Sequence, residues 1–341
     1  MPDLYPIARP LLFAMDAETA HHATLFAMRA ADSLGLLSIV AGPVRSKRIE
    51  LMGLEFPNRV GLAAGLDKAG TAVGAFGHLG FGHVEIGTVT PRPQPGNEKP
   101  RLFRLKSHRA IVNRMGFNNP GVDGLLENLR RSKKNFRGVL GINIGKNFDT
   151  PNERAADDYL ACFEGVYAEA DYVTANLSSP NTKGLRDLQN DASCRELVLR
   201  LQERRESLKP THGGKHVPIV IKIAPDLTDD QVRSLAAVFN ETGVDGVITT
   251  NTTVARDAVS DHPLAGEAGG LSGAPLTGKA TEILGLLRSE MDAAIPIIGS
   301  GGVMSAADAR AKFDAGAALV QVYTGLVYRG PALVREIAEL G

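Results

Sequence analysis

Cysteine is scarce in this sequence, which holds only Cys162 and Cys194 and no C-x-x-C pair. A disulfide framework or a cysteine-based zinc site is therefore not indicated, and a reducing compartment suits the chain. The eight histidines form no H-E-x-x-H pattern, so the helix of a zinc peptidase is missing as well. We expect no metal site.

Excess charge and long apolar runs are also missing. Lys+Arg and Asp+Glu both number 38, so the formal net charge is zero and no bulk attraction to nucleic acid is expected. No apolar run approaches the roughly 20 residues that a membrane-spanning helix needs. The start, Met1–Tyr5, lacks the basic flank and apolar core of a secretory signal.

Strand-like and helix-like segments alternate over most of the chain. With 341 residues, 43% of them hydrophobic, and with 37 glycines and 19 prolines, the chain suits one large barrel or two ordinary domains. Apolar strand-like runs cover residues 59–66, 83–90, 139–145, 172–178, 217–224, 246–251, 295–301 and 319–324. Amphipathic stretches cover residues 121–134, 153–169, 192–208, 229–242, 277–291 and 305–315.

This alternation predicts an α/β fold, a (β/α)8 barrel. A doubly wound open sheet is the alternative, but no G-x-G-x-x-G opens a helix after the first run. Residues 101–105 and 110–115 interrupt the order, and we expect them to form a small hairpin inserted over the barrel mouth.

The N-terminal segment differs from the rest, and we divide the chain into residues 1–42 and a barrel domain of residues 43–341. Ile7, Leu11 and Met15 predict one apolar helical face, and Asp16 is a plausible N-cap for a second helix. Basic residues fringe both helices. Such a pair can lie on a membrane surface, or it can pack on the barrel as a helical lid.

Polar residues gather where the predicted strands end, which is where barrels carry their sites. Asn176–Thr182 follows the fourth run with two carboxamides and two hydroxyls, and Ser179 is a proton acceptor if something activates it. A simple polar turn is the alternative. Asn143, Asn251 and Lys222 lie in or after other apolar runs, and each needs a partner if it is buried.

Glycines are concentrated in the last third, at 269–273, 299–302 and Gly325. In barrels, phosphate groups commonly bind between the loops after the seventh and eighth strands. Together with the small residues after the first strand and Lys222 on the fifth, these glycines fit a flavin mononucleotide, whose reduced ring Lys222 could neutralise.

Several long motifs occur together and in order. They are Ala63–Lys68, Gly87–Pro93, Asn113–Asn119, Gly141–Asn147, Asn176–Thr182, Lys222–Asp226, Thr250–Thr253 and Gly269–Gly273. Through these motifs the chain strongly resembles the dihydroorotate dehydrogenase family, class 2, the quinone-reducing type. The resemblance covers nearly the whole chain, including the N-terminal helices.

The resemblance implies oxidation of (S)-dihydroorotate to orotate in de novo pyrimidine synthesis, with FMN as the first hydride acceptor. It implies that Ser179 is the general base; class 1 relatives have cysteine at that position. The implied substrate contacts are Lys68, Asn113, Arg114, Met115, Gly116, Phe117, Asn176, Asn181, Asn251 and Thr252. The implied flavin contacts are Ala64, Gly65, Leu66, Asp67, Lys68, Thr88, Asn143, Asn176, Lys222, Thr250, Gly273, Gly302, Tyr323 and Thr324.

The resemblance also favours the membrane interpretation of the N-terminal helices, as a peripheral patch and a tunnel for ubiquinone or menaquinone. His21 and Arg104 match positions at the quinone end. The expected location is the cytoplasmic face of a bacterial inner membrane, and the expected state is a monomer. Rival hypotheses are an FMN barrel enzyme with a soluble acceptor such as fumarate or NAD, and a non-catalytic flavin-binding scaffold.

Two further expectations concern the neighbourhood of Ser179. A serine is a poor base at neutral pH, so Thr182 or Thr88 could start a relay that removes its proton. The loop Thr182–Asp187 is expected to open for substrate and close to exclude water.

Overall fold

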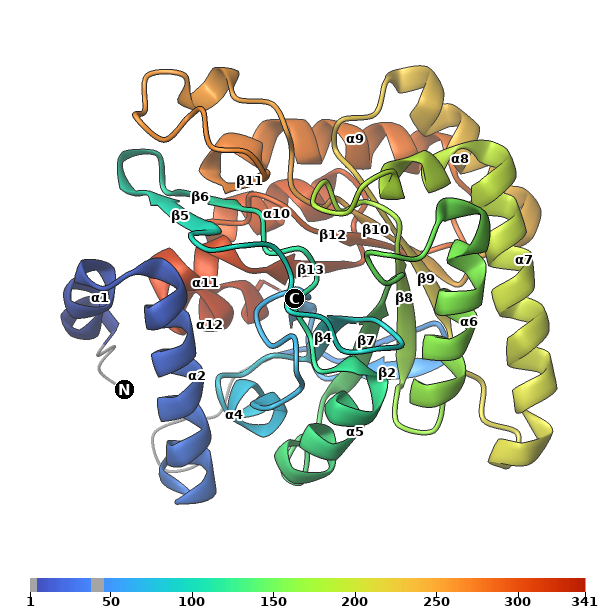
Figure 1. The fold of residues 1–341 in the computed structure, drawn as a ribbon, viewed down its shortest axis with the longest axis horizontal. Coiled ribbons are helices and arrows are strands. Elements are labelled where there is room, and N and C mark those ends of the chain that lie inside the picture. Colours follow the sequence, from blue (N-terminus) through green and yellow to red (C-terminus); the bar gives the residue numbers. More distant parts are fainter. Residues whose placement is uncertain (1–4, 38–45, 341) are drawn as a thin grey trace.

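A computed structural model describes residues 5–37 and 46–340, and its centre is a closed barrel of eight parallel strands (Figure 1). The strands are β3 Val60–Leu62, β4 His83–Val89, β7 Val139–Ile144, β8 Tyr172–Asn176, β9 Ile219–Ile223, β10 Gly246–Thr249, β12 Ile297–Gly299 and β13 Leu319–Val322. Neighbours pair in chain order, and β13 closes on β3. The predicted (β/α)8 barrel is therefore confirmed.

Helices cover the outside of the barrel. They are α4 Val73–His78, α5 Gly121–Ser132, α6 Ala155–Val166, α7 Asp191–Leu208, α8 Asp229–Thr242, α9 Thr277–Glu290, α10 Ala306–Asp314, α11 Thr324–Arg329 and α12 Ala332–Ala338. Helix α8 shows why such segments begin and end where they do. Thr228 and Gln231 form a capping box at its start, and Gly243 ends it with a φ of 62°.

A short hairpin that the sequence analysis did not identify closes the amino-terminal end of the barrel. It consists of β1 Ile49–Leu51 and β2 Leu54–Phe56, and Phe56 packs edge-to-face on His83. Burial lowers the pKa of His83 to about 3, so this histidine stays neutral in the core. A Cβ on Gly61 would lie 1.9 Å from the His83 ring, so only glycine leaves room for it.

A three-stranded sheet lies over the carboxyl end of the barrel. The expected hairpin is present as β5 Leu102–Leu105 and β6 Ala110–Asn113, but β11 Gly270–Gly273 adds a third strand antiparallel to β6. The sequence analysis treated residues 269–273 as a glycine loop only. Glycine is needed here because a Cβ on Gly269 or Gly273 would lie 2.2 or 2.3 Å from a backbone oxygen of β6 or the turn before it.

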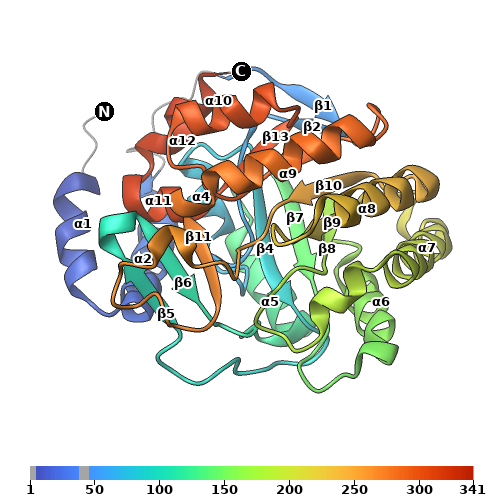
Figure 2. The same cartoon turned by 90° about the horizontal axis from the view of Figure 1, so that it is seen from above.

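The N-terminal helices α1 Tyr5–Ala14 and α2 Ala17–Ser33 stand beside the barrel, on the side away from α6, α7 and α8 (Figures 1 and 2). Asp16 is the N-cap of α2, as predicted, and accepts a hydrogen bond from the Thr19 N–H at 2.9 Å. In the described part of the chain, no helix is long and apolar enough to cross a membrane. The expected boundary at residue 42 lies outside the described residues.

Polar contacts hold the two helices to the barrel. The buried carboxylate of Glu18 in α2 pairs with Arg101 at 2.8 Å, and Arg101 also donates to the carbonyls of Pro95 and Asn97. Although burial alone would raise it, hydrogen bonding and charge from Arg101 and Lys99 lower the pKa of Glu18 to about 2.

Candidate active site

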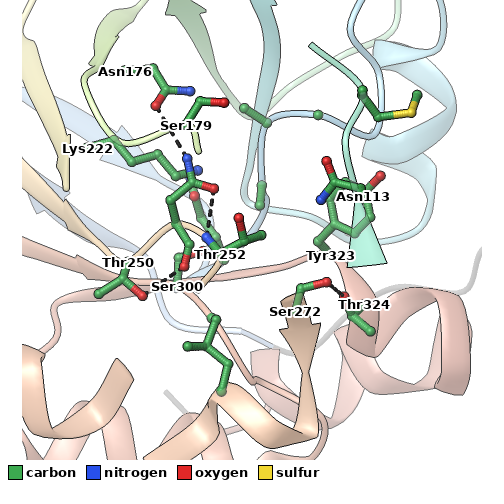
Figure 3. Close-up of a pocket in the computed structure, with 18 of the residues that line it drawn as sticks. Asn113, Asn176, Ser179, Lys222, Thr250, Thr252, Ser272, Ser300, Tyr323 and Thr324 are labelled. Atoms are coloured by element: carbon green, nitrogen blue, oxygen red, sulfur yellow. Dashed lines mark hydrogen bonds between the residues drawn. The ribbon is translucent and has the colours of Figure 1, made fainter. Parts of the chain in front are cut away.

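A pocket opens at the carboxyl ends of the barrel strands, under the sheet of β5, β6 and β11. The space within it amounts to about 970 Å³, a figure that includes open solvent at the mouth. Figure 3 shows Asn176, Ser179 and Lys222 on one side, and Tyr323, Ser272 and Thr324 on the other. The barrel therefore places the polar strand ends around one cavity, as the sequence predicts.

Most of the predicted site residues line this pocket. They include the expected base, Ser179. From the expected substrate set they are Lys68, Asn113, Met115, Gly116, Phe117, Asn176, Asn181, Asn251 and Thr252. From the expected cofactor set they are Ala64, Gly65, Thr88, Lys222, Thr250, Gly273, Gly302, Tyr323 and Thr324.

Four predicted contacts lie outside the lining for local reasons. Arg114 follows Asn113, the last residue of β6, and its side chain pairs with Glu267 at 2.6 Å. Leu66 belongs to the apolar core, and the carboxylate of Asp67 accepts the backbone N–H groups of Thr71 and Ala72. Asn143 is fully buried and lies one layer deeper, behind the pocket wall.

The two expected quinone residues also lie outside the lining. Arg104 joins the mouth sheet to α1, because it donates to the carbonyls of Leu12 and Met15 and its guanidinium lies 4.8 Å from the Phe13 ring centroid. His21 is half-buried on α2. Burial and the neighbouring Lys68 charge lower its pKa to about 4, so α2 lies within electrostatic reach of the pocket.

Ser179 is buried just beyond the end of β8 and lines the pocket. Its Oγ accepts a hydrogen bond from the Asn181 N–H at 3.3 Å. Within residues 5–37 and 46–340, no carboxylate or imidazole bonds to this hydroxyl. The Thr88 hydroxyl, one expected start of a relay, instead bonds to Asn143 and Asn176.

A chain of amide groups runs behind Ser179. The Asn143 Oδ1 accepts from the Thr88 hydroxyl at 2.5 Å and from the Asn176 Nδ2 at 3.2 Å. The Asn176 Oδ1 in turn accepts from the Ser178 hydroxyl at 2.9 Å, and this hydroxyl accepts from the Asn251 Nδ2 at 2.9 Å. Asn143, Asn176 and Asn251 are thus members of one connected network and not independent contacts.

Lys222 has a buried acidic neighbour that the sequence analysis missed. Glu85 on β4 is fully buried, and its Oε1 lies 3.9 Å from the Lys222 Nζ. Burial lowers the pKa of Lys222, and the Glu85 charge offsets this only in part. The expectation that a buried lysine needs an anionic partner is therefore confirmed, with the partner supplied by the protein.

Lys68 lies at the pocket edge and donates to the Asn118 Oδ1 at 2.6 Å. Burial, with the nearby guanidinium of Arg101 adding to it, lowers the pKa of Lys68 to about 7. A lysine in this condition exchanges its proton near neutral pH. It also gains from an anionic ligand that restores its charge.

Glycines shape the opposite wall. Gly302 has a φ of 73°, and a Cβ there would lie 2.4 Å from the backbone N of Thr277. A Cβ on Gly325 would lie 2.1 Å from the Val303 carbonyl oxygen. Side chains are excluded here for steric reasons, so backbone groups form the surface that a ligand meets.

Gln321 is another pocket residue that the sequence analysis missed. Its Nε2 donates to Glu85 at 2.9 Å, and its buried Oε1 has no hydrogen-bond partner among the described residues. Both Gln321 and Glu85 interrupt aliphatic strand runs, as Lys222 and Asn143 do. The same argument about buried polar groups in a strand applies to them and would have identified them.

A closed barrel with an amide-rich, glycine-walled pocket at its mouth defines a (β/α)8 protein of the class that binds a nucleotide-like or heterocyclic ligand there. The family model described as dihydroorotate dehydrogenase matches residues 47–340. The chain belongs to the dihydroorotate dehydrogenase family.

Whole-length relatives and solved structures agree with this assignment. The chain is 57% identical to "Dihydroorotate dehydrogenase (quinone)" of Chromobacterium violaceum, over 98% of this chain and 97% of that protein. It is 54% identical to the protein of the same name from Akkermansia muciniphila, over 99% and 97%. A crystal structure of the Eimeria tenella DHODH with ferulenol matches with a TM-score of 0.86 and 39% identity, covering 94% of this chain and 89% of that one.

Proposed function

We propose that this protein is a quinone-dependent dihydroorotate dehydrogenase that oxidises (S)-dihydroorotate to orotate for pyrimidine synthesis. The observation that carries the proposal is the single pocket that brings Ser179, the asparagine network and Lys222 together with the glycine wall. Family membership over nearly the whole chain supports this proposal.

The pocket suits FMN as the cofactor. Bound FMN would supply the acceptor for a hydride from C6 of the substrate and pass the electrons on to a quinone. Backbone groups at Gly273 and Gly302 would hold its phosphate, with the hydroxyl of Thr324 beside them. The Gln321 Oε1, which has no hydrogen-bond partner in residues 5–37 and 46–340, offers an acceptor to a ring N–H, and the Lys222 ammonium offers a positive charge.

Ser179 is proposed as the base that removes the C5 proton. An N–H bond from Asn181 stabilises negative charge on the Oγ and leaves its other lone pair free to take a proton. The structure gives no protein relay from Thr88, so we propose that the serine proton leaves through the mouth beside the loop Thr182–Asp187. That loop remains a proposed lid.

The proposed substrate contacts are uncharged amides and one cation. Asn113 and Asn181 hydrogen-bond to each other across the mouth, where the Asn181 Nδ2 lies 3.3 Å from the Asn113 Oδ1. Amides can match the carbonyl and N–H groups of a pyrimidine ring without placing charge on it. Lys68 would bind the substrate carboxylate.

The N-terminal helices are proposed as the membrane and quinone segment, residues 1–42, attached to the barrel domain of residues 43–341. Their apolar side chains Ile7, Leu11, Phe26 and Leu34 are each more than 70% exposed. Such a face suits the surface of a lipid bilayer. We place the protein, as a monomer, on the cytoplasmic face of a bacterial inner membrane, with His21 and Arg104 near a ubiquinone or menaquinone.

The test is the rate at which dihydroorotate bleaches the bound flavin in the absence of oxygen. Replacing Ser179→Ala should slow bleaching by roughly 10²–10⁴-fold, because a general base is lost. Ser179→Cys should recover part of the rate as the pH approaches about 8.5, where a thiol ionises. An unchanged rate in Ser179→Ala would remove this residue from the mechanism.

The electron acceptor is tested in the same protein. Turnover with a short-chain quinone should exceed turnover with fumarate or NAD, because the helix pair offers an apolar route to the pocket. Equal or faster turnover with a soluble acceptor would contradict the quinone assignment. Flavin that is bound but never bleached would leave only a binding protein.

A further inference from the structure

We infer that Glu85 is a positioning residue: its buried carboxylate fixes the direction of the amide groups that form the floor and wall of the pocket. The inference rests on the proposed function, because the ligands whose binding it controls are FMN and the pyrimidine. It concerns a residue that does not line the pocket.

Glu85 is surrounded by donors. Its Oε1 accepts from the Asn143 Nδ2 at 2.8 Å. Its Oε2 accepts from the Tyr172 hydroxyl and the Thr174 hydroxyl, both at 3.1 Å, and from the Gln321 Nε2 at 2.9 Å. With the Lys222 ammonium 3.9 Å away, every group around this carboxylate presents hydrogen to it.

An amide side chain can present either its oxygen or its NH2 with almost the same shape, so an amide network alone has no preferred direction. A carboxylate can only accept. Asn143 must therefore give its NH2 to Glu85 and turn its oxygen toward Thr88 and Asn176. Asn176 then donates to Asn143 and keeps its own oxygen for the Ser178 hydroxyl.

Gln321 is oriented by the same carboxylate, and its unbonded side-chain oxygen indicates that a ligand binds beside it. Because its NH2 is held by Glu85, its buried Oε1 is left without a partner among the described residues. An unmet buried acceptor is costly. Since Gln321 lines the pocket, a ligand N–H is the natural donor to it.

One carboxylate thus determines which amide atoms the ligands meet. If Glu85 is replaced by glutamine, the side chain keeps its shape but loses its charge. The side-chain amides of Asn143 and Gln321 should then be able to rotate, so that their oxygen and NH2 exchange places. An NH2 would then replace the oxygen that Gln321 presents to the pocket, and reversal of Asn143 would also disturb Asn176, which lines the pocket. The ligands would lose one or two hydrogen bonds.

The test is a charge-relocation cycle made of Glu85→Gln, Asn143→Asp and the double variant. Glu85→Gln should weaken FMN and orotate binding by roughly 10- to 100-fold, which corresponds to one or two unmet hydrogen bonds. Asn143→Asp alone should also weaken the binding of FMN and orotate, because the new carboxylate then faces the carboxylate of Glu85. In the double variant, the new amide on β4 can donate its NH2 to the new carboxylate on β7, whose other oxygen again accepts from Thr88 and Asn176. At least about tenfold of the loss should therefore return.

The measurements are the FMN dissociation constant, from flavin fluorescence on dilution of the holoprotein, and the orotate dissociation constant, from the flavin spectrum. Thr174→Val is the matched control. It removes one donor to Glu85 from the same core without changing the direction of any amide, so FMN affinity should stay within about twofold.

A double variant that binds no better than Glu85→Gln would overturn the inference, as would a Glu85→Gln protein with wild-type affinities. If Glu85→Gln does not fold, Gln321→Leu tests the same point, because it removes the unmet acceptor and keeps the charge. It should weaken FMN binding about tenfold, and unchanged affinity would count against the inference. A wild-type protein without affinity for FMN would instead contradict the proposed function.

Discussion

The barrel and the N-terminal helix pair differ in how far they bury their apolar side chains. The barrel buries nearly all of its large apolar side chains, whereas α1 has no buried residue and α2 buries only Glu18 and Ala20. Among the residues that the structure describes, six large apolar side chains of the N-terminal segment 5–37 are exposed: Ile7, Leu11 and Phe26 on the two helices, and Met15, Leu34 and Leu36 beside them.

The two regions are accordingly held in different ways. Apolar packing closes the barrel around a polar layer under the pocket. The helix pair is tied by a few polar contacts, such as Glu18 with Arg101 and the Arg9 guanidinium with the Tyr328 carbonyl at 3.0 Å, and by the inward side chains Phe13, Leu25 and Met28. Its other apolar side chains, Ile7, Leu11 and Phe26, stay exposed, which is expected if a lipid surface completes their burial.

The largest expected effect comes from a single methyl group in the barrel. Gly61→Ala would place a Cβ 1.9 Å from the buried His83 ring. The free energy of unfolding should fall by about 3 kcal/mol or more, because the core cannot move aside. Chemical denaturation measures this directly.

Gly285→Ala is the matched control, since nothing lies within 4 Å of its Cβ position on α9. It should stabilise the protein by up to about 1 kcal/mol through helix propensity. If alanine at the two positions has the same effect on the free energy of unfolding, the interior of the barrel at Gly61 is not tightly packed, and this contrast with the helix pair is wrong.

The next effect should separate the two regions. Glu18→Gln removes the charge that pairs with the buried Arg101, which should weaken docking of α2 by about 1.5–3 kcal/mol. Turnover with quinone should fall, while bleaching by dihydroorotate should stay within about twofold, because Glu18 does not line the pocket. Glu55→Gln, in the exposed pair with Arg48, should change neither.

The same contact should fail in acid. The pKa of Glu18 is about 2 in the folded protein against a usual 4.5, so its ionised form stabilises docking at neutral pH. That contribution should be lost as the pH falls from 4.5 toward about 2. Turnover with quinone, but not bleaching by dihydroorotate, should therefore fall in this pH window in the wild type and not in Glu18→Gln. That result would confirm that ionised Glu18 stabilises the docking of α2.

A smaller effect concerns the exposed apolar face. Leu11→Gln should weaken binding to phospholipid vesicles by about five- to tenfold, since part of one aliphatic side chain no longer enters the bilayer. Leu199→Gln on α7, also exposed but on the opposite side, should leave vesicle binding unchanged. Cosedimentation with vesicles distinguishes the two, and equal losses would show that the helix pair is not the contact.

The smallest effect lies where the regions meet, at Lys68. Because its pKa is about 7, the ammonium is present below that pH and is lost above it. The dissociation constant of orotate, an anion, should therefore rise by up to about fivefold between pH ~6 and ~8. In Lys68→Met this rise should disappear; a persisting rise would assign the titration to another group.

The sequence predicts the barrel and the site well where a single continuous run of residues shows the pattern of a strand or a polar residue within it. Apolar runs bounded by turns identify all eight strands, and Lys222 or Asn143 within such runs indicates a buried polar layer. The β11 strand was missed because Gly270–Gly273 has glycine at both ends and gains its structure only by pairing with β6. The β1–β2 hairpin is too short to show a period.

Other differences between the prediction and the structure depend on tertiary contacts, which no local stretch of sequence shows. Arg114 stands within a contiguous motif, yet its side chain pairs with Glu267 and does not line the pocket. The link from Glu85 to Gln321 joins β4 to β13, which are far apart in sequence and come close only because closure of the barrel places β3 between them.

The most direct test of the whole account follows one flavin spectrum in the absence of oxygen. Dihydroorotate added to the purified protein should bleach the flavin absorbance, and a short-chain quinone added afterwards should restore it. A protein that carries no flavin, or whose flavin absorbance ignores dihydroorotate, would contradict the account.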